Sequence, residues 1–388
     1  MRKVDKFEAH LDDFHRITIY LSERFYQGRS DAFYLRDSQG TLTHCDIQSV
    51  EQCGGRNFFK TINITIDIIN GEDYVVLEEH GLSTALQYSL ITKTDRFDEL
   101  FYYKGDDLGC HPTNEKTSFA LWAPTATRVV LELFRKEEPR AFECKRSESG
   151  VFRMSVKSNL HGVGYHYHIL VNGKWNASSD PIARSSAVNN GHSVVVDYNQ
   201  INIPKSKDKL PIINSSLDAI IYELSVRDFT MQKEANIKHR GKFLGLTQEN
   251  AKTNNGVSTG IDHIKELGVT HVQIMPIFDF ATVDEVNVST FYYWGYDPLQ
   301  YNVPDGSFST QTNDPVSKVI EAQEMIQAFH KNGIRVIMDV VYNHVYDMES
   351  SPFELVVPYY FFRRSGNGSL SNGSFCGNDF DSNRLMAR

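Results

Sequence analysis

The sequence predicts a multidomain protein in which two β-rich units precede an α/β unit with a parallel sheet. Three observations support this prediction. The chain has 388 residues, more than one ordinary domain needs. Short apolar strand patterns separated by turn residues fill its first part. From residue 219 onward, strand-like and helix-like segments alternate, which is typical of parallel sheets with right-handed crossovers.

The composition is that of an ordinary globular protein, with 40% hydrophobic and 23% charged residues. The formal net charge of −9 argues against nucleic acid or an anionic membrane as the main partner. No window is apolar for long enough to span a membrane, and the first residues lack a signal-peptide core. The 5 cysteines are scattered without a C-x-x-C pair, which indicates free thiols. We therefore expect a cytoplasmic protein.

Residues 1–100 form the first predicted unit, which is β-rich. Residues 15–21 have a strand pattern, and isoleucines alternate with polar residues over 62–68. Asn70 and Gly71 follow and lead into the apolar segment 74–77, which together predict a hairpin. The unit shows no reactive constellation, so a packing role is favoured over sugar binding.

Residues 101–115 are expected to connect this unit to a second β unit at 116–198. Asn172 and Gly173 predict a hairpin turn in it. His166 and His168 share a strand face, but no third ligand accompanies them, so no metal site is predicted. The strand patterns have sandwich-like spacing and cover residues 119–124, 128–134, 151–156, 165–171 and 194–197. Residues 199–217, with a charged run at 205–209, are the expected linker.

Residues 218–388 form the predicted α/β unit. Residues 365–383 are rich in Gly, Ser and Asn, which predicts a flexible loop. No glycine-rich phosphate-binding pattern follows a strand, so nucleotide cofactors have no support. The expected order is strand 219–224, helix 259–267, strand 270–277, helix 315–332 and strand 335–341, each helix being followed by a glycine.

Residues 334–347 are the stretch around which the chain is organised. Their near-continuous apolar run, interrupted by Asp339, predicts a parallel strand buried on both faces. Tyr342, Asn343 and His344 leave its carboxyl end together, where ligands bind in parallel α/β folds. A core strand with a capped end is the alternative interpretation of the same pattern.

Two strings in this unit resemble known signatures. DVVYNHV at 339–345 resembles the first signature region of the α-amylase superfamily of glycoside hydrolases, and YYWGYDP at 292–298 resembles YNWGYDP of type I pullulanases, with Tyr293 replacing asparagine. FALWAPTATRVVLELF, VNGKW and DPIAR resemble the starch- and glycogen-binding β-sandwich of debranching and branching enzymes, and IYELSVRDFT resembles the opening strand of their catalytic domain. The resemblance implies that 218–388 are the first part of a (β/α)8 TIM barrel.

The resemblance also implies substrate-binding roles. His344 would donate hydrogen bonds to the sugar at the cleavage subsite, while Asp339 and Asn343 would hold the local network. Tyr296 would stack on a sugar ring, because the C–H face of glucose packs on a π face. The full candidate set at this subsite is Tyr292, Trp294, Tyr296, Asp297, Asp339, Asn343 and His344. Further candidate glucan contacts are Trp175 on the sandwich, for which core packing is the alternative, and Asn378 and Asp379 in the excursion after the third strand.

The catalytic carboxylates implied by the resemblance are expected beyond Arg388. A retaining glycosidase uses two carboxylates about 5–5.5 Å apart. In the α-amylase superfamily the nucleophilic Asp follows strand four and the acid/base Glu follows strand five, and Asp228, Asp297 and Asp339 do not match those motifs. We therefore expect no catalytic residue in this chain, and no activity of the 388-residue chain alone.

The predicted function is that of a pullulanase-type glycoside hydrolase. It would cleave α-1,6-glucosidic branch linkages in pullulan, amylopectin, glycogen or limit dextrins by a retaining mechanism, so its partner is an α-glucan. No cofactor is required, although Asn343 matches a calcium ligand of some α-amylases and leaves calcium open. The alternatives are a branching enzyme or isoamylase on the same scaffold, and a non-catalytic glucan-binding fragment.

Overall fold

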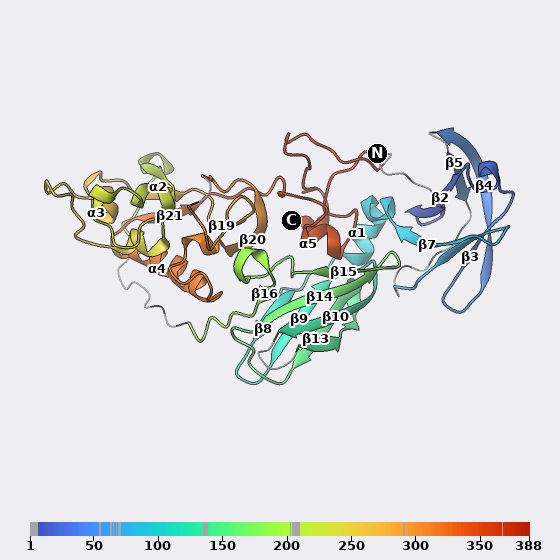
Figure 1. Ribbon diagram of the computed structural model, residues 1–388, viewed down its shortest axis with the longest axis horizontal. Helices are drawn as coiled ribbons and strands as arrows, with labels where there is room; N and C mark the ends of the chain where they lie inside the picture. Colours follow the sequence, from blue (N-terminus) through green and yellow to red (C-terminus); the bar gives the residue numbers. More distant parts are fainter. Residues whose placement is uncertain are drawn as a thin grey trace.

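Three units follow one another along an elongated molecule, as Figure 1 shows. An N-terminal β-barrel, a β-sandwich and a parallel α/β unit appear in the order that the sequence predicts. The computed structural model describes residues 7–388 except 54–55, 63, 65, 67, 69–70, 135–138, 202, 204–209, 290–291 and 367.

The N-terminal unit is a closed barrel with the strand order β1-β2-β5-β4-β3-β6-β7. Closure pairs the strands all round, so that no sheet edge is left open. The strand expected at 15–21 is confirmed by β2. The bounds are Glu8–Asp13 (β1), Arg16–Ser22 (β2), Phe33–Arg36 (β3), Leu42–Cys53 (β4), Arg56–Ile62 (β5), Val75–Glu78 (β6) and Ser83–Tyr88 (β7), with η1 at Tyr26–Gly28.

Among the described strands, the two that flank Gly71, β5 and β6, do not pair with each other. β5 pairs with β2 and β4, whereas β6 pairs with β3 and β7. Ile64, Ile66 and Ile68 are nevertheless buried in the core, so the alternation marked the buried side chains correctly. Positions 63, 65, 67, 69 and 70 of the predicted hairpin lie outside the described residues.

The barrel leads into η2 (Leu90–Lys93) and α1 (Asp95–Phe101). The Thr94 hydroxyl accepts a hydrogen bond from the Phe97 amide at 3.2 Å, which caps the start of α1. Asp95 and Asp98 lie in the first turn, where carboxylates interact favourably with the helix dipole.

The second unit is a two-sheet sandwich. One sheet has the order β11-β10-β14-β15 with β16 on β14, and the other has the order β12-β13-β9-β8. β8 pairs with β9, although it falls in the segment expected to be a connection. Asn172 and Gly173 have φ of 53° and 68°, as the expected hairpin turn requires. The bounds are Gly109–Pro112 (β8), Thr117–Trp122 (β9), Ala126–Phe134 (β10), Arg140–Glu143 (β11), Lys145–Arg146 (β12), Val151–Val156 (β13), Gly164–Val171 (β14), Lys174–Ser178 (β15) and Ser193–Val194 (β16), with η3 at Glu148–Gly150 and η4 at Val188–Asn190.

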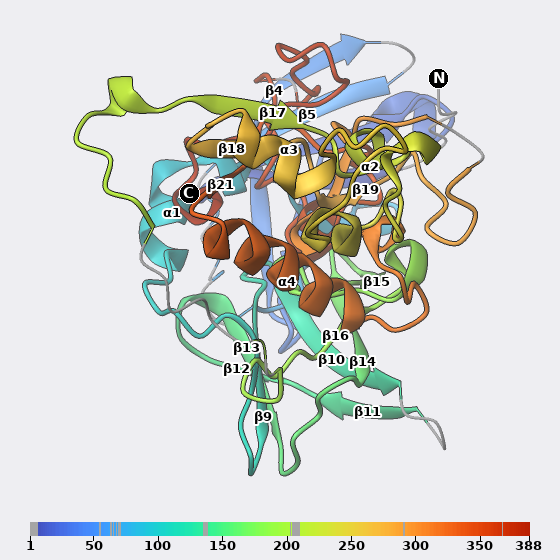
Figure 2. The same ribbon diagram turned by 90° about the vertical axis from the view of Figure 1, so that its left-hand side faces the viewer.

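The third unit contains the parallel sheet β17-β18-β21. The charged run at 205–209 that precedes it lies outside the described residues. In Figure 2, which faces this end of the molecule, α3 and α4 lie in front of the other units. The bounds are Ser216–Asp218 (η5), Ile221–Leu224 (β17), Val226–Thr230 (α2), Lys233–Ala235 (η6), Phe243–Thr247 (η7), Gly260–Glu266 (α3), His271–Ile274 (β18), Phe278–Phe280 (β19), Pro298–Pro304 (β20), Gly306–Phe308 (η8), Ser317–Lys331 (α4) and Arg335–Met338 (β21).

The predicted order of strands and helices in this unit is confirmed, but the predicted burial of its last strand is wrong. β21 ends at Met338, and Met338 and Val340 are 43% and 36% exposed. The reason is that β21 pairs only with β18 among the described strands, so one side of it has no neighbour to cover it. Gly333, with φ of 75°, ends α4 by donating its amide to His330 O at 3.0 Å.

The segment after residue 345 packs against the first two units, and the described residues of 365–383 within it form a loop, as their composition predicts. Its helix α5 (Pro352–Val356) lies beside β15, and η9 (Leu385–Ala387) ends the chain (Figure 1). Tyr360 is fully buried and meets Trp122 edge-on, with ring centroids 4.8 Å apart. The apolar core of the barrel and sandwich therefore continues into this segment.

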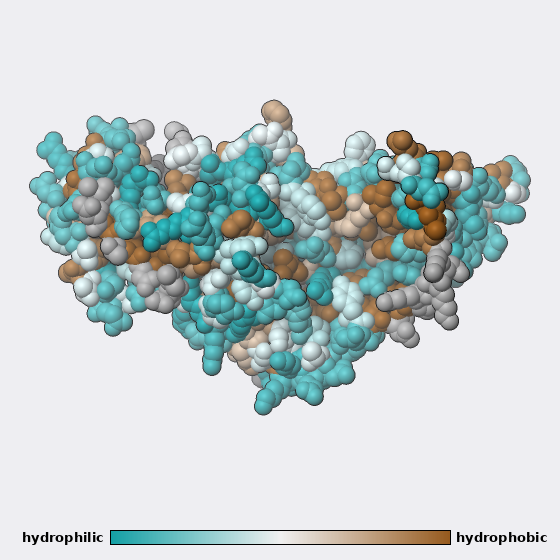
Figure 3. Space-filling view, turned by 180° about the vertical axis from the view of Figure 1, so that it is seen from behind, coloured by the Kyte–Doolittle hydropathy of each residue, from teal (hydrophilic) through white to brown (hydrophobic). Residues whose placement is uncertain are grey.

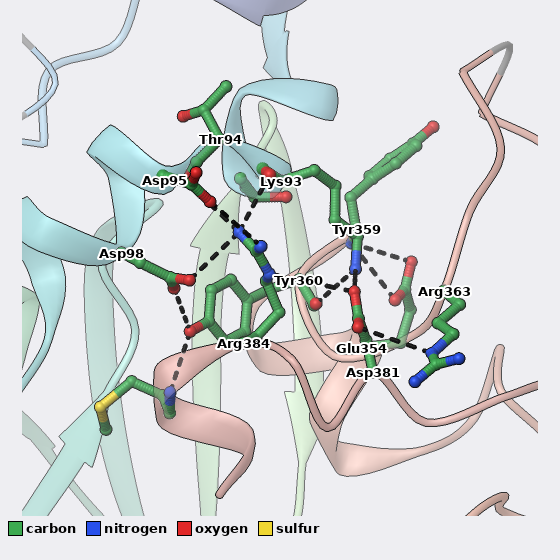
Figure 4. Close-up of polar contacts among 12 residues, drawn as sticks. Lys93, Thr94, Asp95, Asp98, Glu354, Tyr359, Tyr360, Arg363, Asp381 and Arg384 are labelled. Atoms are coloured by element: carbon green, nitrogen blue, oxygen red, sulfur yellow. Dashed lines mark hydrogen bonds and ion pairs between the residues drawn. The ribbon is translucent and has the colours of Figure 1, made fainter.

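Charged groups join the same segment to η2 and α1 (Figure 4). Arg384 Nη1 lies 3.1 Å from Asp98 Oδ2, and the Tyr360 hydroxyl donates to Asp98 Oδ1 at 2.5 Å. Lys93 Nζ donates to Asp381 Oδ2 at 2.9 Å and to Tyr360 O at 2.7 Å. Partly buried ion pairs thus fix the segment to the end of the N-terminal barrel.

Candidate functional site

The loop containing YYWGYDP and the loop after β21 meet at the carboxyl end of the parallel sheet. The Tyr296 hydroxyl donates to Asp339 Oδ2 at 3.0 Å. His344 Nε2 lies 3.0 Å from Tyr296 O and must be the donor, because a carbonyl only accepts. The two pairs are separated by 43 and 48 residues in the chain. The structure therefore brings residues of two distant segments together at one site, as the sequence predicts.

His344 is part of the framework of the site. It is 8% exposed, and its Nδ1 lies 3.2 Å from Asn343 Oδ1. Tyr301 donates its hydroxyl to His344 O at 2.7 Å. Both ring nitrogens therefore face protein groups, and donation to a sugar would require His344 to exchange one of these contacts.

Tyr296 presents its ring to the surface and its hydroxyl to Asp339. The residue is 36% exposed. Burial of the hydroxyl, together with its hydrogen bond to Asp339, raises the pKa of Tyr296 to about 12. The phenol hence stays protonated at neutral pH and keeps donating to the carboxylate, which fixes the ring in place.

Gly295 permits the tight path of the loop. Its φ is +84°, a region that side chains rarely adopt, and a Cβ there would lie 3.1 Å from Phe280 and from Pro276. Tyr293, which replaces the consensus asparagine, is 8% exposed, and the centroids of its ring and of the Phe280 ring are 5.1 Å apart. The side chain at 293 thus packs in the core beneath the loop.

Asp297 also lies partly inside the protein. Its backbone oxygen accepts from the Ala281 amide at 3.0 Å. Its Oδ2 is buried and has no hydrogen-bond partner among the described residues. Burial raises the pKa of the Asp297 carboxyl.

Exposed aromatic side chains accompany Tyr296 in and beside the two strings. Tyr292 and Trp294 are 62% and 61% exposed, and the Tyr292 hydroxyl donates to Asp228 Oδ2 at 2.6 Å. Tyr342 and Tyr346 are 53% and 54% exposed, and the predicted substrate-binding set does not include them, although both stand within or beside DVVYNHV. We call Tyr292, Trp294, Tyr296, Tyr342 and Tyr346 the aromatic surface. Such rings suit the stacking of sugar faces.

The candidates outside this surface differ in their surroundings. Trp175 is 45% exposed with the Arg128 guanidinium 5.6 Å from its ring centroid, so it is not a core residue. Asn378 is 3% exposed and uses both amide atoms on the backbone of Val345, at 2.8 and 3.0 Å. Its predicted contact with glucan is therefore not supported by the structure.

Asp379 holds the surrounding loop together. It accepts hydrogen bonds from the Ser371 hydroxyl at 2.5 Å and from the Gly373 and Ser374 amides at 2.7 Å. These hydrogen bonds, of which the one from Ser371 contributes most, hold the pKa of Asp379 well below its usual range. Both carboxylate oxygens of Asp379 accept hydrogen bonds from the loop, so a glucan contact is not supported for Asp379 either.

Two clusters of His, Cys, Asp and Glu among the described residues combine ligand types that suit a metal, and neither includes the His166 and His168 pair. One is Glu78, Glu79 and His80, and the other is Asp279, Glu285 and Asp305. His168 Nε2 instead lies 2.7 Å from Glu132 Oε2.

A lysine lies within the second cluster. Lys318 Nζ lies 3.6 Å from Glu285 Oε1 and donates to Ser186 Oγ at 3.0 Å. Ser186 in turn donates to Asp279 Oδ2 at 3.0 Å. Burial raises the pKa of Asp279 well above its usual range and that of Asp305 to about 7. An ammonium group therefore supplies positive charge to buried acids, at a junction between the sandwich and the α/β unit.

Cys45, Cys110, Cys144 and Cys376 are free thiols, as the sequence predicts for them. Within the described part of the chain, no helix combines the length and apolarity needed to cross a lipid bilayer.

Three family descriptions match parts of the chain. The Pullulanase N1-terminal domain matches residues 7–92. Carbohydrate-binding module 48 (Isoamylase N-terminal domain) matches residues 107–183, and the α-amylase catalytic domain matches residues 241–359. These matches confirm a sandwich of the carbohydrate-binding module 48 type followed by part of an α-amylase-type catalytic domain.

Individual relatives agree with these matches. A pullulanase of Bacillus subtilis (strain 168) is 37% identical over 384 residues, which are 98% of this chain and 52% of that protein. The crystal structure of a pullulanase from Anoxybacillus sp. LM18-11 gives a TM-score of 0.92 at 41% identity, covering 98% of this chain and 55% of the other. The type I pullulanase of Bacillus subtilis str. 168 complexed with maltose gives a TM-score of 0.91 at 36% identity, covering 100% and 54%. The chain spans about half the length of these pullulanases and is homologous to their N-terminal part over nearly its whole length.

Proposed function

We propose that this chain forms the substrate-binding part of a pullulanase-type debranching enzyme, which hydrolyses α-1,6 branch linkages of α-glucans such as pullulan, amylopectin, glycogen or limit dextrins. The observation that carries the proposal is the direct joining of the two strings, through Tyr296, Asp339 and His344, beneath an exposed aromatic surface. The maltose and maltotriose complexes of homologous pullulanases support an α-glucan as the ligand.

In this proposal, Tyr296 is the platform for the sugar ring at the cleavage subsite. Tyr292 and Trp294 extend the platform along the loop, where their rings are the most exposed of the surface. Asp339 orients Tyr296, and His344 fixes the backbone of the same residue. A rigid ring loses little conformational freedom on binding, which favours a preformed site.

The acids at the site act as positioning groups in this proposal. Asp228 accepts from Tyr292, and Asp339 accepts from Tyr296, so each is committed to orienting an aromatic ring. We assign the nucleophile and the acid/base of the retaining reaction to carboxylates outside this chain. The proposal requires no cofactor and, on the basis of the free thiols, places the protein in the cytoplasm.

The second candidate function, for the 388-residue chain by itself, is glucan binding without hydrolysis. The commitment of Asp228 and Asp339 to tyrosine hydroxyls favours it. It differs from the first candidate in one product, the reducing ends that hydrolysis creates.

The test combines affinity electrophoresis in pullulan with an assay of reducing-sugar release. We expect the chain to be retarded by pullulan without releasing reducing sugar, and Tyr296→Ala to lose most of the retardation. Tyr102→Ala is the matched control, because Tyr102 is 39% exposed and lies outside the aromatic surface. Equal retardation of the two variants would contradict the assigned platform, and sugar release by this chain would contradict the assignment of the catalytic carboxylates.

A further inference from the structure

A cavity of about 280 Å³ lies between the β-sandwich and the loop that follows β21. Its lining includes Pro298 and Val345, the last residues of the two site strings, so it lies directly behind the proposed cleavage subsite. Ser179 and Asn190 line it from the sandwich, and Ser351 lines it from the start of α5, which lies beside β15 (Figure 1). No ring of the aromatic surface belongs to this lining.

Two buried polar atoms in this lining have no partner among the described residues, namely Ser351 Oγ and Asn190 Oδ1. Ser351 is 5% exposed and occupies the N-cap position of α5, yet its hydroxyl caps no helix amide. A serine in that position normally accepts a bond from the first turn of its helix. Because an unpaired buried hydroxyl or amide destabilises the folded state, these two atoms point to a ligand that satisfies them.

The lining restricts the chemistry of that ligand. It contains hydroxyls and an amide but no lysine or arginine, so an anion would find no cationic partner. Its one carboxylate, Asp347, already accepts hydrogen bonds from the Ser350 amide at 3.0 Å and from the Ser350 hydroxyl at 2.5 Å. A calcium ion takes about 6–8 oxygen ligands, and a single carboxylate that is already hydrogen-bonded is too few for it. Burial lowers the pKa of His166, so this imidazole is neutral at pH 7. A neutral polyhydroxyl compound matches these groups, since sugar hydroxyls both donate and accept.

We propose that this cavity is a second sugar-binding site, which takes the terminal glucosyl unit of an α-glucan. The choice of an α-glucan rests on the proposed function. The volume falls just below the about 300–1,000 Å³ of typical ligand sites, which suits one sugar ring better than an extended chain. A sugar bound there contacts the β-sandwich through Asn190 and the α/β unit through Ser351, and so bridges these two units.

The test is calorimetric titration of the 388-residue chain with maltotriose. All proteins carry Trp175→Ala, which removes the exposed ring of β15 as a competing site. With Tyr296 and Ser351 intact we expect two classes of site. Tyr296→Ala should remove one of them, Ser351→Leu should weaken the other at least tenfold by filling the cavity, and the double variant should bind no sugar.

A second variant keeps the test decisive if Ser351→Leu fails to fold. Ala177 is an exposed residue of the cavity lining, so Ala177→Phe obstructs the entrance from the surface. Lys174→Phe is its matched control, exposed on the same strand but outside the lining. We expect Ala177→Phe to lose the second class of site and Lys174→Phe to keep it.

The possible failures are distinguishable. Two classes of site that survive both Ser351→Leu and Ala177→Phe would overturn the cavity proposal, as would the loss of all binding in Tyr296→Ala with the cavity intact. Binding that Ser351→Leu removes and Tyr296→Ala leaves unchanged would support the cavity and would instead contradict the proposed function of the aromatic surface.

Discussion

Lys318→Met should destabilise the protein far more than the same change at Lys331, on the same helix. The Lys318 and Glu285 side chains are 3% and 2% exposed, and the ammonium faces a cluster with Asp279 and Asp305. Removing one partner of a buried ion pair costs about 3–5 kcal/mol, because the other charge stays buried without compensation. Lys331 pairs with Glu249 at 2.9 Å, but these side chains are 62% and 37% exposed, so its removal should cost about 0–1 kcal/mol.

The assay is urea-induced unfolding followed by circular dichroism, at pH 5 and at pH 8. Asp305 has a folded pKa of about 7 against an ordinary value of 3.8, so its protonated form is favoured in the folded protein. An acid whose folded pKa is raised contributes stability that is fully present below about pH 4 and is lost as the pH rises through about 7. Stability should therefore fall from pH 5 to pH 8, and more steeply in Lys318→Met, which lacks the compensating charge.

Equal losses for Lys318→Met and Lys331→Met would refute this reasoning. That outcome would mean that shared protons alone neutralise the cluster. A deficit of Lys318→Met that is the same at both pH values would contradict the role assigned to the buried acids, even if the variant is less stable.

Two further predictions concern the YYWGYDP loop. Gly295→Ala should lower the free energy of unfolding in urea by about 1–3 kcal/mol more than Gly268→Ala does. Both glycines have positive φ, but only Gly295 has neighbours within 4 Å of an added Cβ. Equal losses for the two variants would contradict the close contact with Phe280. Tyr296→Phe should keep the binding of maltotriose within about twofold and lose about 0.5–1.5 kcal/mol of stability, since the ring remains and one hydrogen bond goes. The pKa of Tyr296 is about 12 in the folded protein against an ordinary value of 10.0. The hydroxyl therefore stabilises the folded state below pH 10, and this contribution is lost between about pH 10 and 12. Spectrophotometric titration of the wild type, with Tyr296→Phe as the reference, would measure this raised pKa.

The local patterns of the α/β unit were sufficient to predict its element order. Hydrophobic periodicity and glycine stops located β17, β18, β21 and both crossover helices to within a few residues. The resemblance of two short strings to one site located the meeting of Tyr296 with Asp339 and His344, although YYWGYDP lies between β19 and β20, which pair antiparallel, and only DVVYNHV directly follows a strand of the parallel sheet. The exposure of Met338 could not be predicted in this way, since periodicity reports apolar character and not the presence of a neighbouring strand.

The order in the segment after residue 345 was beyond the reach of local patterns. Its glycines, serines and asparagines predict the loop conformation that the structure shows, but not that Asp379 accepts bonds from Ser371, Gly373 and Ser374 within that loop. Its anchors are remote in the chain, as the separation of 262 residues between Tyr360 and Asp98 illustrates. A contact at such distance is set by the packing of three units and leaves no periodic signal.

This remote anchoring connects the candidate site to the N-terminal barrel. The Phe380 amide donates to Asn343 O at 2.9 Å, and the next residue, Asp381, is held by Lys93. Arg384 continues the contacts to Asp98 (Figure 4). The backbone beside His344 is therefore braced by a segment whose far end is fixed to α1.

The space-filling view in Figure 3 shows polar and apolar residues mixed over the middle of the molecule. Asp98→Ala removes the acceptor of Tyr360 and leaves Arg384 without its closest carboxylate. We expect faster amide hydrogen exchange at Phe380, by about tenfold if one hydrogen bond worth about 1.4 kcal/mol is lost from the anchor. The Val336 amide, in the β18-β21 pairing, is the internal control and should be unchanged. Exchange at Phe380 that matches wild type would show that the site is held by its own loops, independently of α1.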